Sequence, residues 1–473
     1  MHEVTSSRIA HTPPRVLPRL RPQTLIAAVF LALPAILFYG ILFRTAIDVP
    51  FEDDYEALLD FLNRMAELKS VSARASYFLA AQYNEYKLFF GHGVAWLQFA
   101  LLGHVDVRLL CAFGNIFVLL LAILLWKMFL PNHKVLCDRV VLFIPVSWLL
   151  FQLQYAETLN WSMPALQNLP VLVFSFGSIY CLLRPTRRAF CAALVCLVLA
   201  VAASGNGLLL IPMGLLILAV NRYYVRIVSW LSISAGCVAA YAYHYNVMSS
   251  QSQIHHSVLW TVMRPRPFYV IAFIGNAAAF VKGALWFGGR YHPLDLWLSL
   301  LLGLVLCVFF VAVAKRGYIR RNPLVSYCVL YLFLTALGVA GLRSDFGIAQ
   351  SLAPRYRVYS ALFLIFAWFV IVEEYLQQEI VSLRRSRILL ITIVGTVLFS
   401  LSMDAVGWFY LVQRNREIVR GMAAFEHPVS PVSSIGPILP DPSRNARFDV
   451  LVRRAPGILR QSIKLGIYRP PMY

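Results

Sequence analysis

Long apolar segments alternate with short polar loops along most of the chain. The apolar segments run for roughly 14 to 22 residues, and clusters of Arg, Lys, Pro or Asn separate them. Runs such as 109–125 and 294–314 are apolar on every side of a helix, whereas a strand of a membrane barrel would show about ten residues of alternating polarity. A helix crosses a hydrocarbon core of about 30 Å in about 20 residues. The pattern therefore predicts an all-α, polytopic integral membrane protein.

We expect about 11–13 membrane-spanning helices. The assigned spans are 25–43, 109–130, 140–154, 166–183, 189–204, 207–221, 227–245, 294–314, 324–342, 358–376 and 388–410. The segment 268–288 is also apolar enough to span, but a full crossing there would move the basic cluster at 315–321 to the other side. Its glycines, Asn276 and Lys282 suit backbone that lines a cavity, so we interpret it as an interfacial or re-entrant element.

Basic residues indicate which helix ends face the cytoplasm. With a cytoplasmic N-terminal segment, 1–24, alternate short loops carry Lys and Arg, whereas loops 155–165 and 204–207 carry none. This predicts a multi-pass protein of a bacterial inner membrane, with its C-terminus in the periplasm. The first apolar segment is longer than a signal-peptide core and has no small-residue cleavage site, so we interpret it as an uncleaved signal anchor. The basic clusters are Lys127, Lys134 and Arg139; Arg184, Arg187 and Arg188; Arg222 and Arg226; Lys315, Arg316, Arg320 and Arg321; and Arg384, Arg385 and Arg387.

The composition excludes an ordinary soluble domain. Hydrophobic residues make up 60% of the 473 residues and charged residues 14%, against about 45–50% and about 25% in soluble domains. The net charge of +20 could suggest nucleic acid, but the basic residues lie in the loops assigned to the cytoplasm. We therefore expect the lipid bilayer as a partner and no nucleic acid.

Three long regions fall on the predicted outer side. The membrane domain, 25–410, contains the first outer loop, 44–108, which we expect to carry interfacial helices, and a second loop, 246–293. A shorter late loop, 343–357, falls on the same side. Several prolines interrupt the tail, 411–473, and predict a small periplasmic segment. The functional machinery is therefore expected to face the periplasm.

The first outer loop opens with a cluster of carboxylates at 52–56. Asp53 with Glu56 fits a capping box at the start of an amphipathic helix. Capping uses one carboxylate, which leaves Glu52 and Asp54 near the membrane surface. Partial desolvation would raise the pKa of a carboxyl there and suit a general base, and we favour Asp54 for this role over Asp53. Paired carboxylates could instead hold a divalent cation, and metal dependence stays open.

Further along this loop, ionisable residues are interleaved with aromatic residues. Glu85, Lys87 and His92 are candidates for substrate binding, and the two glycines that flank His92 would allow close approach of backbone and substrate. Such residues also occur as snorkelling or belt residues at the membrane interface.

Arginines in the late loop lie on the side where the positive-inside rule does not expect them. Arg343 and Arg355 are therefore candidates for anion binding, because the guanidinium fork matches a phosphate. Tyr356 follows and could donate a hydrogen bond. The alternative is an arginine that anchors the interface or pairs with Asp345.

These segments resemble the glycosyltransferase superfamily C. The likeness is carried by the Glu52-Asp53-Asp54-Tyr55 segment, by 84–90 (Asn-Glu-Tyr-Lys-Leu-Phe-Phe), and by 353–356 (Ala-Pro-Arg-Tyr) before a late helix. The resemblance implies transfer of a sugar from a polyprenyl-phosphate donor to a glycan or lipid acceptor on the outer face. It also implies an acidic residue of the first outer loop as catalytic residue, either Asp53 or Asp54.

Two other functions remain open at this stage. A transporter or flippase of lipid-linked saccharides would need ionisable residues in mid-membrane, for which Lys282 and Asp404 are the candidates. A non-catalytic protein of envelope assembly is the third possibility.

Overall fold

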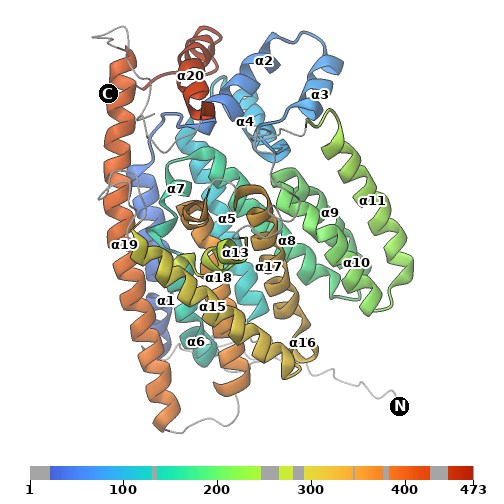
Figure 1. Cartoon of the computed structure of the whole chain (residues 1–473), viewed down its shortest axis with the longest axis vertical. Coiled ribbons are helices and arrows are strands. Elements are labelled where there is room, and N and C mark those ends of the chain that lie inside the picture. Colours follow the sequence, from blue (N-terminus) through green and yellow to red (C-terminus); the bar gives the residue numbers. More distant parts are fainter. Residues whose placement is uncertain are drawn as a thin grey trace, which may run out of the picture.

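The computed structural model describes residues 22–129, 136–246, 266–280, 292–344, 347–376, 383–426 and 446–471. These residues form helices joined by short connections, with two isolated β-bridges and no named strand among them. Most of the helices run side by side as a bundle, and a smaller group lies across one end of it (Figure 1). The all-α prediction is confirmed.

Eleven helices of the described residues form the bundle. Among the described residues, nine helices are long and apolar enough to cross a membrane, which confirms a polytopic membrane protein. Two assigned spans, 189–204 and 207–221, correspond to α9 and α10, which have 17 and 11 residues and are shorter than a typical crossing. The bundle helices are α1 (Pro22–Thr45), α5 (Val107–Met128), α6 (Leu136–Leu150), α8 (Ser162–Leu182), α9 (Arg187–Ala203), α10 (Leu210–Val220), α11 (Tyr224–Ala242), α15 (Pro293–Lys315), α17 (Pro323–Arg343), α18 (Arg357–Ile371) and α19 (Leu383–Glu426).

The pattern of burial separates central from peripheral helices. The apolar window that contains α18 is 83% buried, whereas those of α11 and α19 are 11% buried and leave apolar side chains for lipid. Small residues allow the closest approaches. A Cβ on Gly114 of α5 would lie 2.7 Å from the Cβ of Ala165 on α8, so only glycine fits this contact.

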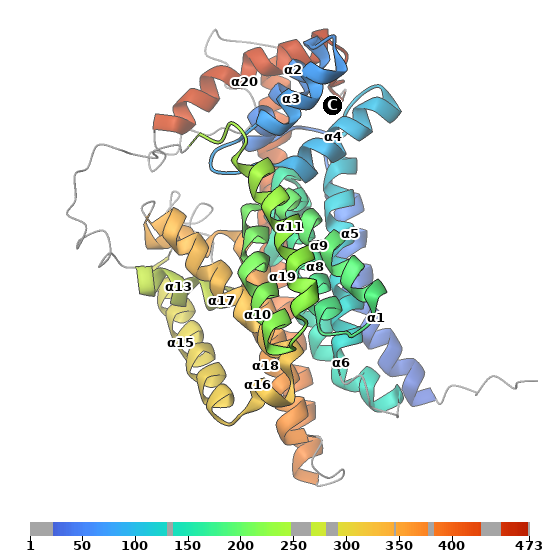
Figure 2. The same cartoon turned by 90° about the vertical axis from the view of Figure 1, so that its right-hand side faces the viewer.

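A second group of helices, here called the cap, covers one end of the bundle (Figures 1 and 2). It consists of η1 (Tyr55–Asp60), α2 (Phe61–Glu67), α3 (Val71–Ala80), α4 (Phe89–Leu102) and α20 (Ala446–Lys464). The cap has its own apolar core, in which Tyr55 and Leu62 meet Ile418 of α19 and Leu459 of α20. The expected helices of the first outer loop are thus present, and α20 joins them from the far end of the chain.

The structure corrects the expected end of the last span at residue 410. Helix α19 continues to Glu426 and has 44 residues, or about 66 Å at 1.5 Å per residue, twice the hydrocarbon thickness. Its final turns carry Ile418 and Met422, which are buried in the core of the cap. The prolines that were expected to break the helix begin at Pro428. The boundary at 411 therefore falls inside a helix that links the bundle to the cap.

The described part of segment 268–288 is a short helix, α13 (Arg266–Ile274), followed by the turn η4 (Asn276–Ala278). Gly275 lies against the backbone of α15, where an added Cβ would be 1.9 Å from the carbonyl oxygen of Ser299. Nine helical residues are too few for a crossing. Lys282 and the rest of the segment lie outside the described residues.

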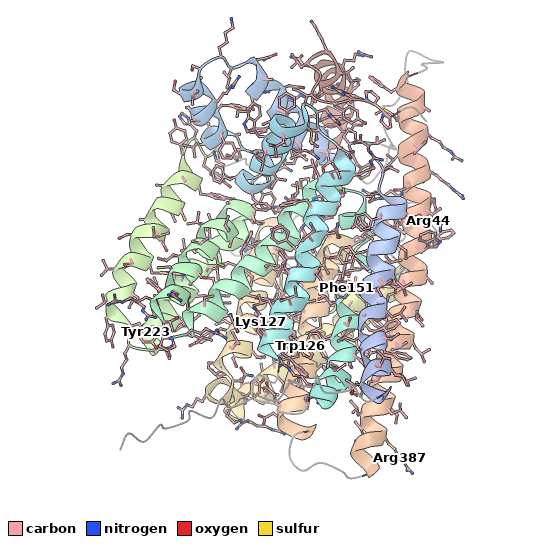
Figure 3. The ribbon with its side chains drawn as sticks, turned by 180° about the vertical axis from the view of Figure 1, so that it is seen from behind. Arg44, Trp126, Lys127, Phe151, Tyr223 and Arg387 are labelled. Atoms are coloured by element: carbon pink, nitrogen blue, oxygen red, sulfur yellow. The ribbon has the colours of Figure 1, made fainter. Side chains whose placement is uncertain are left out.

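Basic residues of the loops assigned to the cytoplasm lie at the end of the bundle away from the cap. Lys127 and Arg387 lie in the half of the bundle away from the cap, and Arg44 lies near the cap (Figure 3). The start of α1 and the end of α19 lie at opposite ends (Figure 1). By the positive-inside rule, the end away from the cap is expected to be cytoplasmic.

Candidate functional site

A cavity of about 210 Å³ lies where the cap meets the bundle. Its walls come from the first outer loop, α8, the turn η3 (Gly205–Leu209), the end of α17 and the turn η7 (Pro354–Tyr356). Five of the candidate residues line it: Glu52, Asp53, Arg343, Arg355 and Tyr356. The first outer loop and the late loop therefore meet at one site, although about 300 residues separate them in sequence.

Asp53 is one of the carboxylates that line this cavity. The hydroxyl of Tyr83 donates a hydrogen bond to its Oδ1. Burial raises the pKa of Asp53, and the neighbouring charge of Glu52 raises it further. The hydrogen bond from Tyr83 and the charges of Arg355 and Arg343 oppose this shift in pKa. A buried carboxyl with a raised pKa suits proton abstraction.

Asp54, the base preferred from the sequence, does not line the cavity, so the geometry favours Asp53 as the candidate base. Its side chain is buried and accepts hydrogen bonds from the backbone of Phe51 (3.2 Å), from Ser162 Oγ (2.8 Å) and from the backbone of Met163 (2.9 Å). The expected capping box is absent as well, because Glu56 pairs with Arg454 of α20 at 2.6 Å. Asp54 connects the first outer loop to the start of α8, whereas Asp53 lines the cavity.

The backbone around the cavity is strained at two residues. Glu52 has a φ of 41° and Asn84 a φ of 54°, and both line the cavity. Side chains other than glycine rarely adopt this left-handed conformation, and such outliers cluster at functional sites. Both turns direct neighbouring residues, Asp53 and Tyr83, toward each other.

Arg343 and Arg355 enter the cavity as members of ion pairs. Arg343 Nη2 lies 2.9 Å from Glu85 Oε2 and 3.4 Å from the hydroxyl of Tyr86. Arg355 Nη1 lies 3.3 Å from Glu157 Oε2. Asp345, the partner considered for these arginines, lies outside the described residues. The guanidinium groups of Arg343 and Arg355 thus line the same cavity as the carboxyl groups of Glu52, Asp53 and Glu56.

Besides Asp54, three more candidates do not line the cavity and have structural contacts instead. Glu85 holds Arg343. The ammonium group of Lys87 is fully buried and donates to the carbonyl oxygens of Leu79, Ala80 and Tyr243 at 2.7–3.0 Å, which ties α3 to the end of α11. These contacts give Glu85 and Lys87 a structural role, and their assignment to substrate binding stays a prediction.

His92 is the third of these residues. Its ring stacks on Phe61 with 4.0 Å between centroids, and Nε2 lies 2.9 Å from the carbonyl oxygen of Ala57. Burial lowers the pKa of His92 to about 3. The side chain therefore stays neutral and packs inside the cap.

Several residues of the site escaped sequence reasoning. Amide and hydroxyl side chains from α8 and η3 line the cavity opposite the charged loops, and Trp161 lies beside them. The signal that could have found them is the presence of amides inside apolar spans, where polar groups are costly and often functional. The polar residues of this wall are Gln167, Asn168, Ser204 and Asn206.

The candidate metal site consists of two carboxylates. Within the described ranges, no group of three or more His, Cys, Asp and Glu side chains is placed to hold a metal ion. Glu52 and Asp53 both line the cavity and could contribute oxygen ligands to a divalent cation that a substrate phosphate also binds.

Comparison with known proteins places the chain in no family. No protein-family model matches it, and neither a curated protein nor a solved structure gives a significant match. The functional argument therefore rests on the geometry of the cavity.

Proposed function

We propose that the protein is a membrane glycosyltransferase that transfers a sugar from a polyprenyl-phosphate donor to a glycan or lipid acceptor at the periplasmic face. The observation that carries this proposal is the placement of Asp53, Arg343 and Arg355 around one cavity at the junction of cap and bundle. A phosphate needs cationic donors, and an acceptor hydroxyl needs a base. The resemblance to glycosyltransferase superfamily C supports the same assignment.

In this mechanism, Asp53 accepts the proton of the acceptor hydroxyl. The hydroxyl oxygen forms a bond to the anomeric carbon, while the bond from that carbon to the phosphate oxygen breaks and its electron pair leaves with the polyprenyl phosphate. Arg343 and Arg355 stabilise the charge that develops on the phosphate. Tyr83 orients the carboxylate of Asp53 through its hydrogen bond.

The uncharged wall of the cavity suits the sugar. Amide side chains both donate and accept hydrogen bonds, as sugar hydroxyls do. Gln167 of α8 and Asn206 of η3 line the cavity together with Trp161, so they could orient a sugar ring against the indole. The cavity thus combines a phosphate end, a base and a neutral polar wall.

The flippase alternative loses one of its two candidate residues. The carboxylate of Asp404 accepts a hydrogen bond from the backbone of Leu153 at 2.7 Å, so helix packing accounts for this residue. Lys282 lies outside the described residues.

The test is an assay of the purified protein in lipid nanodiscs with radiolabelled polyprenyl-phosphate sugars and a panel of envelope glycolipids. We expect donor consumption, and we expect Asp53→Asn to reduce the rate by about two to four orders of magnitude. Asp54→Asn is the matched neighbour and should keep most of the rate per folded molecule. Equal rates for Asp53→Asn and the wild type would remove Asp53 from the chemistry and would contradict the proposal.

A further inference from the structure

Glu157 lies between two arginines behind the cavity wall. It belongs to the short helix α7 (Ala156–Leu159). One of its oxygens, Oε2, lies 3.3 Å from Nη1 of Arg355, and the other, Oε1, lies 3.7 Å from Nη1 of Arg414 on α19. The side chains of Glu157 and Arg414 are 6% and 8% exposed, whereas Arg355 is 24% exposed and lines the cavity. One buried carboxylate therefore serves one buried arginine and one that faces the cavity.

Aromatic rings complete the surroundings of Arg414. Its guanidinium carbon lies 3.8 Å from the ring centroid of Phe51 and 5.4 Å from that of Trp161. The guanidinium carbon of Arg355 lies 5.6 Å from the same Trp161 ring. Nε and Nη2 of Arg414 have no hydrogen-bond partner among the described residues. Both guanidinium groups thus lie near the Trp161 ring, and the carboxylate of Glu157 lies within 4.0 Å of each of them.

We propose that Glu157 is a positioning residue for Arg355, an inference that rests on the proposed function. A guanidinium has five N–H donors, and Glu157 holds that of Arg355 through one of its terminal nitrogens. The rest of the fork can then bind a phosphate in the cavity. Glu157 also screens Arg355 from the positive charge of Arg414. Without the carboxylate, repulsion between the two arginines would turn Arg355 out of its position over Trp161.

The isosteric change Glu157→Gln tests this role. Asp60→Asn is the matched control, because Asp60 also bridges two arginines, Arg64 at 3.1 Å and Arg454 at 3.6 Å, and does not line the cavity. The double variant Glu157→Gln with Arg414→Gln removes the repulsion together with the carboxylate. Each variant is first checked for thermal unfolding in nanodiscs.

The first measurement does not depend on activity. Phenylglyoxal modification of Arg355 is followed by peptide mass spectrometry, with Arg343 as the reference within the same molecule. Glu157→Gln should accelerate modification of Arg355 and leave Arg343 unchanged. An unchanged rate at Arg355 in folded Glu157→Gln would overturn the positioning role, whatever the protein's activity.

The second measurement is the dissociation constant of polyprenyl phosphate, together with the donor KM. We expect Glu157→Gln to weaken binding by about tenfold, the double variant to recover part of this loss, and Asp60→Asn to match the wild type. If Arg355→Ala loses binding and Glu157→Gln does not, the inference fails while the proposed function stands. A wild-type protein that binds no polyprenyl phosphate would refute the proposed function, and the modification rates would still decide whether Glu157 holds Arg355.

Discussion

Asp54 offers the sharpest test of how the site is assembled. Its carboxylate accepts three hydrogen bonds, from the backbone of Phe51, the hydroxyl of Ser162 and the backbone of Met163. Asp54→Ala would remove the acceptor for all three donors in a place where the side chain is 1% exposed. Ser162 can rotate its hydroxyl, but the two backbone N–H groups cannot turn away.

The expected loss of stability follows from the two backbone N–H groups that would be left without an acceptor. A buried donor without an acceptor costs about 1–3 kcal/mol, so Asp54→Ala should lower the free energy of unfolding by about 2–6 kcal/mol. Asp53→Asn should change this free energy by less than about 1 kcal/mol, because Asp53 faces the cavity. The two adjacent carboxylates would then have different roles, since Asp54 would be needed for stability and Asp53 for catalysis.

The wild-type stability should also depend on pH. Burial raises the pKa of Asp54 from its ordinary value of 3.8 to about 7. Between these two values the folded chain retains a proton that the unfolded chain has lost, so the free energy of unfolding should fall as pH rises from about 4 to about 7 and then level. In Asp54→Asn this decline should become shallower, because the amide does not titrate.

Thermal and denaturant unfolding in detergent, followed by the reactivity of the buried cysteines, measure both effects. Donor turnover per folded molecule is recorded in parallel for each variant. An Asp54→Ala protein as stable as the wild type would refute the inferred role of the three hydrogen bonds. A pH profile of stability that Asp54→Asn leaves unchanged would assign the titration to another group.

Three further predictions concern the proposed reaction and the topology. The transfer rate should rise with pH, and the midpoint of this rise should lie above the ordinary carboxyl pKa of about 4. The reason is that burial raises the pKa of Asp53, the proposed base, which must be ionised to act. In a pH-rate profile, the residual activity of Asp53→Asn should lack this rise. Arg355→Lys keeps the charge but loses the planar guanidinium fork, so the affinity for polyprenyl phosphate should fall by about tenfold in a binding assay. Arg64→Lys, which alters a surface ion pair, should leave this affinity unchanged. A reporter fused after Arg188 should read cytoplasmic and one fused after residue 471 periplasmic, and identical readings would overturn the predicted topology.

The long apolar segments were sufficient to predict the fold class. Each assigned span coincides with part of a helix, because uninterrupted apolar stretches leave the backbone no partner but itself in lipid. The last span was assigned too early an end, at residue 410 instead of Glu426, because the assignment relied on hydropathy alone. Residues 411–426 are amphipathic and are stabilised by the cap, and this tertiary contact leaves no signal in hydropathy.

The site was predictable to the level of segments. The acidic cluster and the late arginines were expected to work together, and the structure brings Asp53 and Arg355 to one cavity. The choice between Asp53 and Asp54 was beyond sequence reasoning, because adjacent residues on a helix point about 100° apart. That choice depends on donors of Ser162 and Met163, more than a hundred residues further along.

The position of Asp53 depends on contacts made by the last residues of the chain. The hydroxyl of Tyr468 donates to the carbonyl oxygen of Asp48 at 2.6 Å, and Arg454 pairs with Glu56 at 2.6 Å, so the C-terminal segment holds the acidic cluster from both sides. These contacts join residues about 400 positions apart, and α19 connects the bundle to the cap in which they lie. The C-terminal segment therefore supports the candidate site, and under the proposed function it helps to position Asp53 as the base.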